Sequence, residues 1–551
     1  MNERTKRGLD CIEAALLLGV TGDALLRATP WGINVLLWTA VLAVAFVALV
    51  MRWHVALLKA EGRWLVFPLV FFAAAFAWRD SHVLKSLDFM ALLLVLALMG
   101  WRAHGRMIRL AGVMEYALAI LVSVGNALFA FFPLALSDVR WKELRGFGWS
   151  RHVWAVVRGL LIALPLLFVF GLLFMAADAV FAGFVNKVFH VNFETLFSHL
   201  FLILFLTWIV GGFLRGAFIG EGVSALKNEP LMVTLGLNTS TTQMIKDGTT
   251  EGAGNKAQQI SGTLRTGIVE IGVVLGLLNL LFLSFVLVQI KYFFGGAGLV
   301  QATTGLTYSE YARRGFFELV TVATLVLPLL LAAHWLLRKD NPIHERIFRA
   351  LSSVQIVLLF VIMASAVGRM RLYQSEYGQT ELRIYTTAFM GWLALVFVWF
   401  TLTVLRGARE RFACGALVTA FLMIGLLHVI NPDALIVRAN MRLAQTGRGF
   451  DAYYAAALSA DAVPTLVEAL PAASHYDQCV ITKSLLRRYD ELGSSDWRSW
   501  NLARAGARRA IENHLLGLRE AACPQLMSPS TVSPAAPVAP PGVAPASEVQ
   551  N

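Results

Sequence analysis

The stretch IGVVLGLLNLLFLSFVLVQI, residues 271–290, decides the fold class. It carries no charged side chain, and it is about as long as a helix that crosses the apolar part of a bilayer, which takes ~20 residues. Gly159 to Ala177 form a second run of the same character. A helix pairs its backbone N–H and C=O groups internally, which allows it to lie in lipid. The sequence therefore predicts an all-α, polytopic membrane helix bundle.

Apolar runs of this kind recur along the chain. They predict about 11 spans, near residues 31–51, 64–78, 88–100, 110–134, 153–177, 197–218, 267–290, 315–337, 350–368, 385–405 and 411–430. The second and third are short, which predicts a tilted pair or a hairpin around Arg79, Asp80 and Lys85. Residues 1–30 include Glu13 and Asp23, and we expect an amphipathic helix at the membrane interface there. Residues 31–430 form the predicted transmembrane domain.

Composition agrees with a membrane protein. Of the 551 residues, 57% are hydrophobic and 15% are charged, whereas soluble domains average about 25% charged. The formal net charge is +12, and we expect the basic residues behind it to lie in loops that meet anionic lipid head groups. No motif typical of nucleic-acid binding occurs, so membrane lipids are the expected partners and nucleic acid is not.

Charged residues return after Asn431, and long apolar runs stop. Residues 431–522 predict a small extramembrane helical module that could bind a protein partner. Residues 523–551 are rich in Pro and Ala and predict a disordered tail. Cys479 and Cys523 lie on this part of the chain, and they either form a disulfide, if it faces an oxidising compartment, or stay unpaired.

The orientation is predicted from the loops that hold Lys and Arg. Loops near 140–151, 215–265, 338–349 and 406–411 are richer in these residues than the alternate loops. Placing them in the cytoplasm puts the N-terminus inside and the C-terminal module in the periplasm of a bacterial inner membrane. The basic loop at 101–109 conflicts with this arrangement.

Two polar blocks near span ends predict a binding site on the outer side. The candidate residues are Arg313, Arg314, Glu318, Arg369, Arg371, Tyr373, Tyr377 and Arg383. Arginines with tyrosines at an interface can hold a phosphate, because guanidinium offers two parallel N–H donors and tyrosine a hydroxyl. The alternative is structural: interfacial aromatic residues anchor helices, and Arg and Glu neutralise each other.

Patterns for metal binding or catalysis are weak. His190 and His199 flank Glu194 without an HExxH motif, and His428 stands alone in the sequence. A metal site needs three or four converging ligands, and no GxSxG sequence occurs. We expect no metal and no cofactor, and the catalytic residues are unknown.

Several blocks resemble one family. They are TGDALLRATPWGINVLL (21–37), LLNLLFLSFVLVQIKYFFGG (277–296), GLTYSEYARRGFFELVTVATL (305–325), RMRLYQSEYGQTELRIYTTAFMGWLAL (369–395), NPDALIVRANM (431–441) and DAYYAAALSADAVPTLVEALP (451–471). Together they resemble the bacterial integral membrane proteins catalogued as domain of unknown function 4173. The resemblance implies a polytopic protein with a C-terminal helical segment and carries over no catalytic residue.

Three hypotheses follow for function. The first is a non-enzymatic transport or envelope-maintenance protein that uses the polar blocks to contact lipid head groups or an anionic solute. The second is an interface enzyme that transfers a lipid-linked phosphate group, with Glu310 or Glu318 as base. The third is a membrane scaffold or sensor that acts through residues 431–522.

Overall fold

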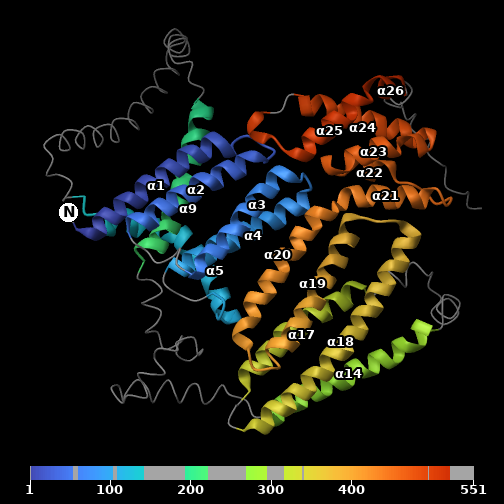
Figure 1. Ribbon diagram of the computed structural model, residues 1–551, viewed down its shortest axis with the longest axis horizontal. Helices are drawn as coiled ribbons and strands as arrows, with labels where there is room; N and C mark the ends of the chain where they lie inside the picture. Colours follow the sequence, from blue (N-terminus) through green and yellow to red (C-terminus); the bar gives the residue numbers. More distant parts are fainter. Residues whose placement is uncertain are drawn as a thin grey trace, which may run out of the picture.

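A computed structural model (Figure 1) describes residues 2–53, 60–103, 108–141, 193–220, 268–294, 316–337, 341–493 and 496–521. Within these ranges the chain folds into helices and forms no β-strand, which confirms the all-α prediction. The span near 153–177, Arg313, Arg314, Cys523 and residues 523–551 lie outside the described residues.

Eight described helices are long and apolar enough to cross a membrane: Ile33–Arg52, His82–Ala103, Thr195–Phe218, Ile268–Gln289, Phe316–Leu336, Pro342–Tyr377, Glu381–Thr403 and Arg409–Ile430. Their outward faces are apolar, as Leu277, Leu280 and Leu281 illustrate with more than 60% of each side chain exposed. Such surfaces are suited to lipid rather than water. The structure therefore supports a multi-pass membrane protein, while the predicted number of about 11 spans is not confirmed.

The helices form two bundles that share one helix. The first contains α1 (Glu3–Leu26), α2 (Ile33–Arg52), α3 (Val66–Trp78), α4 (His82–Ala103), α5 (Val113–Phe129) and α9 (Phe193–Phe218). The second contains α14 (Ile268–Phe294), α17 (Phe316–Leu336), α18 (Pro342–Tyr377) and α19 (Glu381–Thr403). Helix α20 (Phe412–Ile430) connects the bundles, because Ala413 packs into the first core and Phe412 into the second.

The remaining described helices form a third core. They are α21 (Pro432–Ala444), α22 (Ala452–Ala457), α23 (Val463–Ala469), α24 (His475–Gly493), α25 (Leu502–Asn513) and α26 (Leu515–Glu520), and are called the C-terminal helices below. Their core includes Ile436, Leu466 and Ile511, each at most 1% exposed. In Figure 1 these helices, in orange and red, lie across one end of the bundles. We call the end of the bundles on which the C-terminal helices lie the joint end, and the far end of the bundles the opposite end.

Helix α1 packs along α9 through a stripe of small residues. Cys11, Ala15 and Gly19 lie four residues apart on one face and are buried. A Cβ atom on Gly19 would lie 2.6 Å from the carbonyl oxygen of Ile203, so only glycine allows this approach. Small residues permit the close backbone contact typical of helix pairs in membranes. The predicted interfacial position of α1 stays a prediction, although α1 runs alongside α9 from Arg4 at the opposite end to the loop at Pro30 and Trp31 at the joint end.

The predicted span near 110–134 is bent. Helix α5 and the short helical segment Phe131–Asp138 meet at 51°. The segment begins at the opposite end, where Tyr116 donates to the carbonyl of Ile108 just beyond α4. It ends there too, because the buried carboxylate of Asp138 binds Arg4 at 2.8 Å and Arg215 at 2.6 Å. Both ends of this bent segment thus lie at the opposite end.

Candidate functional site: the joint between the bundles and the C-terminal helices

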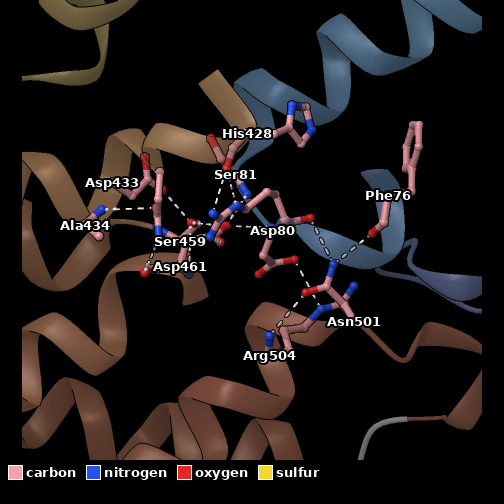
Figure 2. A network of polar contacts seen from close by, with 12 residues as sticks. Phe76, Asp80, Ser81, His428, Asp433, Ala434, Ser459, Asp461, Asn501 and Arg504 are labelled. Carbon is pink, nitrogen blue, oxygen red and sulfur yellow. Dashed lines mark hydrogen bonds and ion pairs between the residues drawn. The ribbon is translucent and has the colours of Figure 1, made fainter. Parts of the chain in front are cut away.

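A network of buried polar side chains joins the turn between α3 and α4 to the C-terminal helices (Figure 2). Asp461 is at its centre. Its Oδ2 atom accepts from the backbone N–H groups of Asp80 and Ser81 at 2.6 and 3.1 Å, and Arg79 Nη1 lies 3.0 Å from its Oδ1 atom. The Asp461 side chain is 1% exposed. Three donors therefore compensate the cost of burying its charge.

Arg79 also reaches the last turn of α20. Its Nε and Nη2 atoms donate to the carbonyl of His428 at 2.8 and 2.6 Å. A planar guanidinium can bind a carboxylate and a carbonyl at once. One side chain therefore holds α3, α20 and the C-terminal helices together, and the α3–α4 pair is a hairpin around Arg79 and Asp80, one of the two predicted alternatives.

Asn501 caps two helices at the same time. Its Oδ1 atom accepts from the N–H of Arg504 at 3.1 Å, which caps the N-terminus of α25. Its Nδ2 atom donates to the carbonyls of Phe76 and Arg79 at 2.8 and 2.9 Å, where α3 ends. Helix ends leave backbone N–H and C=O groups without intrahelical partners. The Asn501 side chain therefore satisfies such groups at the start of α25 and at the end of α3.

Arg504 forms the second charged contact of the joint. Its Nε atom lies 3.1 Å from Asp80 Oδ1, which also binds Lys85 Nζ at 2.6 Å. Its Nη1 and Nη2 atoms donate to the carbonyls of Pro30 and Trp31 at 3.2 and 2.7 Å. Burial lowers the pKa of Arg504, and the charge of Asp80 opposes that effect. The loop between α1 and α2 is thereby tied to α25.

Asp433, at the start of α21, extends the joint on the other side of Asp461. Its carboxylate accepts from the N–H of Ser459 at 3.2 Å and from the Ser459 hydroxyl. The pKa of Asp433 is raised to about 6, mainly by burial; the hydrogen bonds from Ser459 lower this pKa and the charges of Glu381 and Asp461 raise it. A proton on Asp433 is therefore favoured near neutral pH more than for an exposed aspartate.

His428 does not stand alone in the folded chain. Its Nε2 atom lies 3.1 Å from Asp88 Oδ2, and Nδ1 lies 2.9 Å from the carbonyl oxygen of Ile424. Both His428 and Asp88 are fully buried. The sequence pattern around His428 gives no sign of this partner, because Asp88 lies on another helix 340 positions away. This pair fastens α4 to α20 directly beneath the joint.

The predicted Arg/Tyr site is partly assembled. Arg383 stacks on the Tyr373 ring at 4.2 Å, and Tyr373 contacts Tyr377 with ring centroids 5.1 Å apart. Arg383 also donates to the carbonyls of Tyr377 and Gly378 at 3.1 and 2.5 Å. These bonds close the turn between α18 and α19, so Arg383 binds its own backbone.

The other candidates are dispersed. Arg369 donates to Gln289 Oε1 on α14 at 2.7 Å. Arg371 is exposed on α18, and Glu318 is exposed in the first turn of α17. Arg313 and Arg314 lie outside the described residues. Among the described residues no group of three His, Cys, Asp or Glu converges as metal ligands.

The residues that form the joint were not among the predicted site residues. Asp461 lies within the predicted helical module, residues 431–522, just before α23. Its partners at 79–81 lie about 380 positions away. No local pattern indicates such a pairing, because the carboxylate at a cap looks the same whether its partner is near or distant in sequence.

A family model described as a domain of unknown function (DUF4153) matches residues 66–469. The match covers more than half of the 551 residues. The chain belongs to the DUF4153 family. The predicted resemblance to domain of unknown function 4173 is therefore wrong. The DUF4153 region begins with α3 and ends with α23, so it contains the contact between Arg79 and Asp461. No curated protein and no solved structure matches the chain.

Proposed function

We propose that this chain is a non-enzymatic envelope-maintenance protein of the bacterial cytoplasmic membrane. In this proposal the helix bundles hold the C-terminal helices as a fixed platform on the periplasmic face. The observation that carries it is the joint, in which Asp461, Asn501 and Arg504 bind three different loops or helix ends of the bundles. A segment tethered only for partner capture would need no such buried charged network.

The charge distribution supports this orientation. Among the described residues of the two bundles, more Lys and Arg lie near the opposite end than near the joint. Those at the opposite end are Arg4, Lys6, Arg7, Arg52, Arg102, Arg109, Arg140, Arg215, Arg346, Arg349, Arg406, Arg409 and Arg411. Cytoplasmic loops of membrane proteins are enriched in these residues. The C-terminal helices also carry Lys and Arg, but the rule counts short loops and the ends of spans rather than long extramembrane segments. The basic loop near 101–109 follows α4, which begins at the joint and ends at the opposite end. It agrees with this orientation when α1 runs between the two ends and the bent segment does not cross.

Two further observations support a periplasmic position for the C-terminal helices. Cys479 is disulfide-bonded, whereas Cys11 and Cys414 are free thiols in the bundles. Disulfides persist mainly outside the cytoplasm. In addition, Trp31, Trp497 and Trp500 are 37%, 68% and 46% exposed near the joint. Tryptophan is enriched at membrane–water interfaces, so these rings fit a joint that lies at the level of the outer head groups.

The contacts of the Arg/Tyr blocks favour this proposal over an interface enzyme. Phosphate transfer would require arginines whose N–H groups face a ligand. Arg383 donates to backbone carbonyls, and Arg448 pairs with Glu376 at 2.9 Å. These arginines thus fasten α18, α19 and the C-terminal helices to one another.

The orientation is tested by thiol labelling in intact cells. Cys11 and Cys414 are replaced by Ser, and one new thiol is introduced at Tyr453→Cys, 61% exposed in α22, or at Ile343→Cys, 54% exposed in α18. We expect a membrane-impermeant maleimide to label the first variant in intact cells and the second only after lysis. The reverse pattern would place the platform in the cytoplasm and refute the proposal.

The role is tested by complementing a deletion strain of the source bacterium. Deletion should increase sensitivity to detergent and chelator, and Asp461→Asn should fail to restore resistance although the protein still reaches the membrane. Glu491→Gln is the matched control, because Glu491 pairs with Arg487 on the surface of α24. A deletion strain with normal resistance, or full rescue by Asp461→Asn with the C-terminal helices released to protease, would exclude this function.

A further inference from the structure

A cavity of about 470 Å³ lies at the opposite end, far from the joint. Its walls come from the start of α18, the end of α17, the turn between α19 and α20, and the residue Leu110 beyond α4. The first and second bundles therefore meet in this cavity. A volume of this size fits a small polar ligand or a lipid head group.

Three arginines line the cavity. Arg349 pairs with Glu345 at 3.0 Å across one turn of α18. Arg409 and Arg411 flank Glu410, and within the described part of the chain neither guanidinium has a hydrogen bond or ion pair. The lining thus carries an excess of positive charge over its two carboxylates. Guanidinium groups in this state are suited to bind phosphate with two parallel N–H donors.

The backbone adds to this positive field. Residues Arg409–Arg411 form the turn that leads into α20, so the N-terminus of a 19-residue helix points to the cavity. Helix N-termini favour anions because their first N–H groups lack intrahelical partners. The C-terminal end of α19 also lies near the cavity, and free carbonyl groups there would oppose anion binding. The carbonyls of Thr403 and Val404 instead accept hydrogen bonds from the backbone N–H groups of Ala408 and Gly407.

The remaining wall of the cavity combines His334 with apolar side chains. Leu110, Phe348 and Val404 line it, and Leu110 is 44% exposed. The cavity lies where α17, α18, α19 and α20 begin or end, which is the level of the lipid phosphates if these helices cross the bilayer. Basic pockets between helices at this depth bind head groups of anionic lipids.

We propose that this cavity is a phosphate-binding site for the head group of an anionic phospholipid. Arg409 and Arg411 bind the phosphate, Arg349 closes one side while it is held by Glu345, and the apolar wall contacts the glycerol and the first acyl carbons. The site is at the other end of the molecule from the joint and does not depend on the proposed envelope function.

Native mass spectrometry of the full chain in mild detergent tests the site, with phosphatidylglycerol and phosphatidylethanolamine offered in equal amounts. We expect Arg409→Gln/Arg411→Gln to retain about tenfold less phosphatidylglycerol than the unaltered chain, as expected for the loss of charge-assisted hydrogen bonds. Arg346→Gln/Arg406→Gln is the matched control, because both residues are exposed at the same end, do not line the cavity and remove the same charge. This control should retain the lipid.

A second variant tests whether lipid binding needs the space in the cavity, without altering any charge. Ala408→Phe fills the cavity without changing any charge and should also reduce bound phosphatidylglycerol, while an unchanged elution volume reports intact folding. Inorganic phosphate is added in a separate arm and should displace the lipid. The proposal would be overturned if both double variants lost bound phosphatidylglycerol equally, or if no variant lost it. It would also be overturned if the chain bound no phosphatidylglycerol and were stabilised by inorganic phosphate instead.

Discussion

Asp433 shows how a single side chain of the joint responds to pH. Burial raises its pKa from 3.8 to about 6, so the folded chain binds this proton more tightly than the unfolded chain does. Stability from this group is therefore present below pH 3.8 and declines as the pH rises to about 6. A difference of about two pKa units corresponds to on the order of 3 kcal/mol at neutral pH.

Asp433→Asn removes this proton equilibrium. We expect the midpoint of thermal unfolding of the variant, relative to the unaltered chain, to rise between about pH 4 and pH 7, because only the unaltered chain has to bury or neutralise a charge there. The measurement near pH 4 is the internal control, since both side chains are then neutral. A difference that stays constant across this range would contradict the pKa of Asp433.

Sequence analysis identified some residues of the joint but not their roles. The charges at Arg79, Asp80 and Lys85 did predict a turn, because charged groups between two apolar runs must leave the lipid. Their partners Asp461 and Arg504 could not be predicted, since the pairing depends on how the C-terminal helices dock. For the same reason the bonds from Arg383 to the carbonyls of Tyr377 and Gly378 could not be predicted.

At the scale of the element, apolar length was the reliable signal. It predicted α2, α4, α9, α14 and α17 to α20, because a run without charges has few alternatives to a buried or lipid-facing helix. It could not predict how α1 packs. Glu13 is exposed, whereas Asp23 binds Arg27 at 2.8 Å and His199 at 2.6 Å, so the two acidic residues of this helix have different surroundings.

Two glycine substitutions should differ in their effect on stability. Gly19→Ala places a methyl group against the Ile203 carbonyl and should lower the unfolding temperature, since overpacking costs about 1–3 kcal/mol. Gly276→Ala in α14 meets no atom within 4 Å. It should leave stability unchanged or raise it, because alanine favours helix by about 1 kcal/mol. Equal unfolding temperatures for the two variants would contradict the close contact of α1 with α9.

At the scale of the whole molecule, the joint should make the C-terminal helices and the bundles unfold together. Leu466→Ala creates a cavity in the C-terminal core, which costs about 2–5 kcal/mol. Cys11 is 1% exposed in the first core and reports on the bundles through its thiol. With Cys414 replaced by Ser, Leu466→Ala should lower the temperature at which Cys11 reacts.

Leu516→Ala is the control for this coupling, because Leu516 is 79% exposed in α26. It should leave the reaction temperature of Cys11 unchanged. If Leu466→Ala melts the C-terminal helices but Cys11 stays protected, the two parts unfold independently, and the joint would be a contact without energetic coupling.

The bent segment Val113–Asp138 decides whether the number of membrane crossings before the later loops is odd or even. Its two ends contact the same end of the first bundle, although its two helices meet at 51°. We therefore expect that it does not change the side on which the chain continues. Reporter enzymes fused after residue 103 and after residue 141 should therefore give the same signal. If the segment does not cross, counting it as a crossing adds one inversion and moves every later loop, together with the C-terminal helices, to the other side of the membrane.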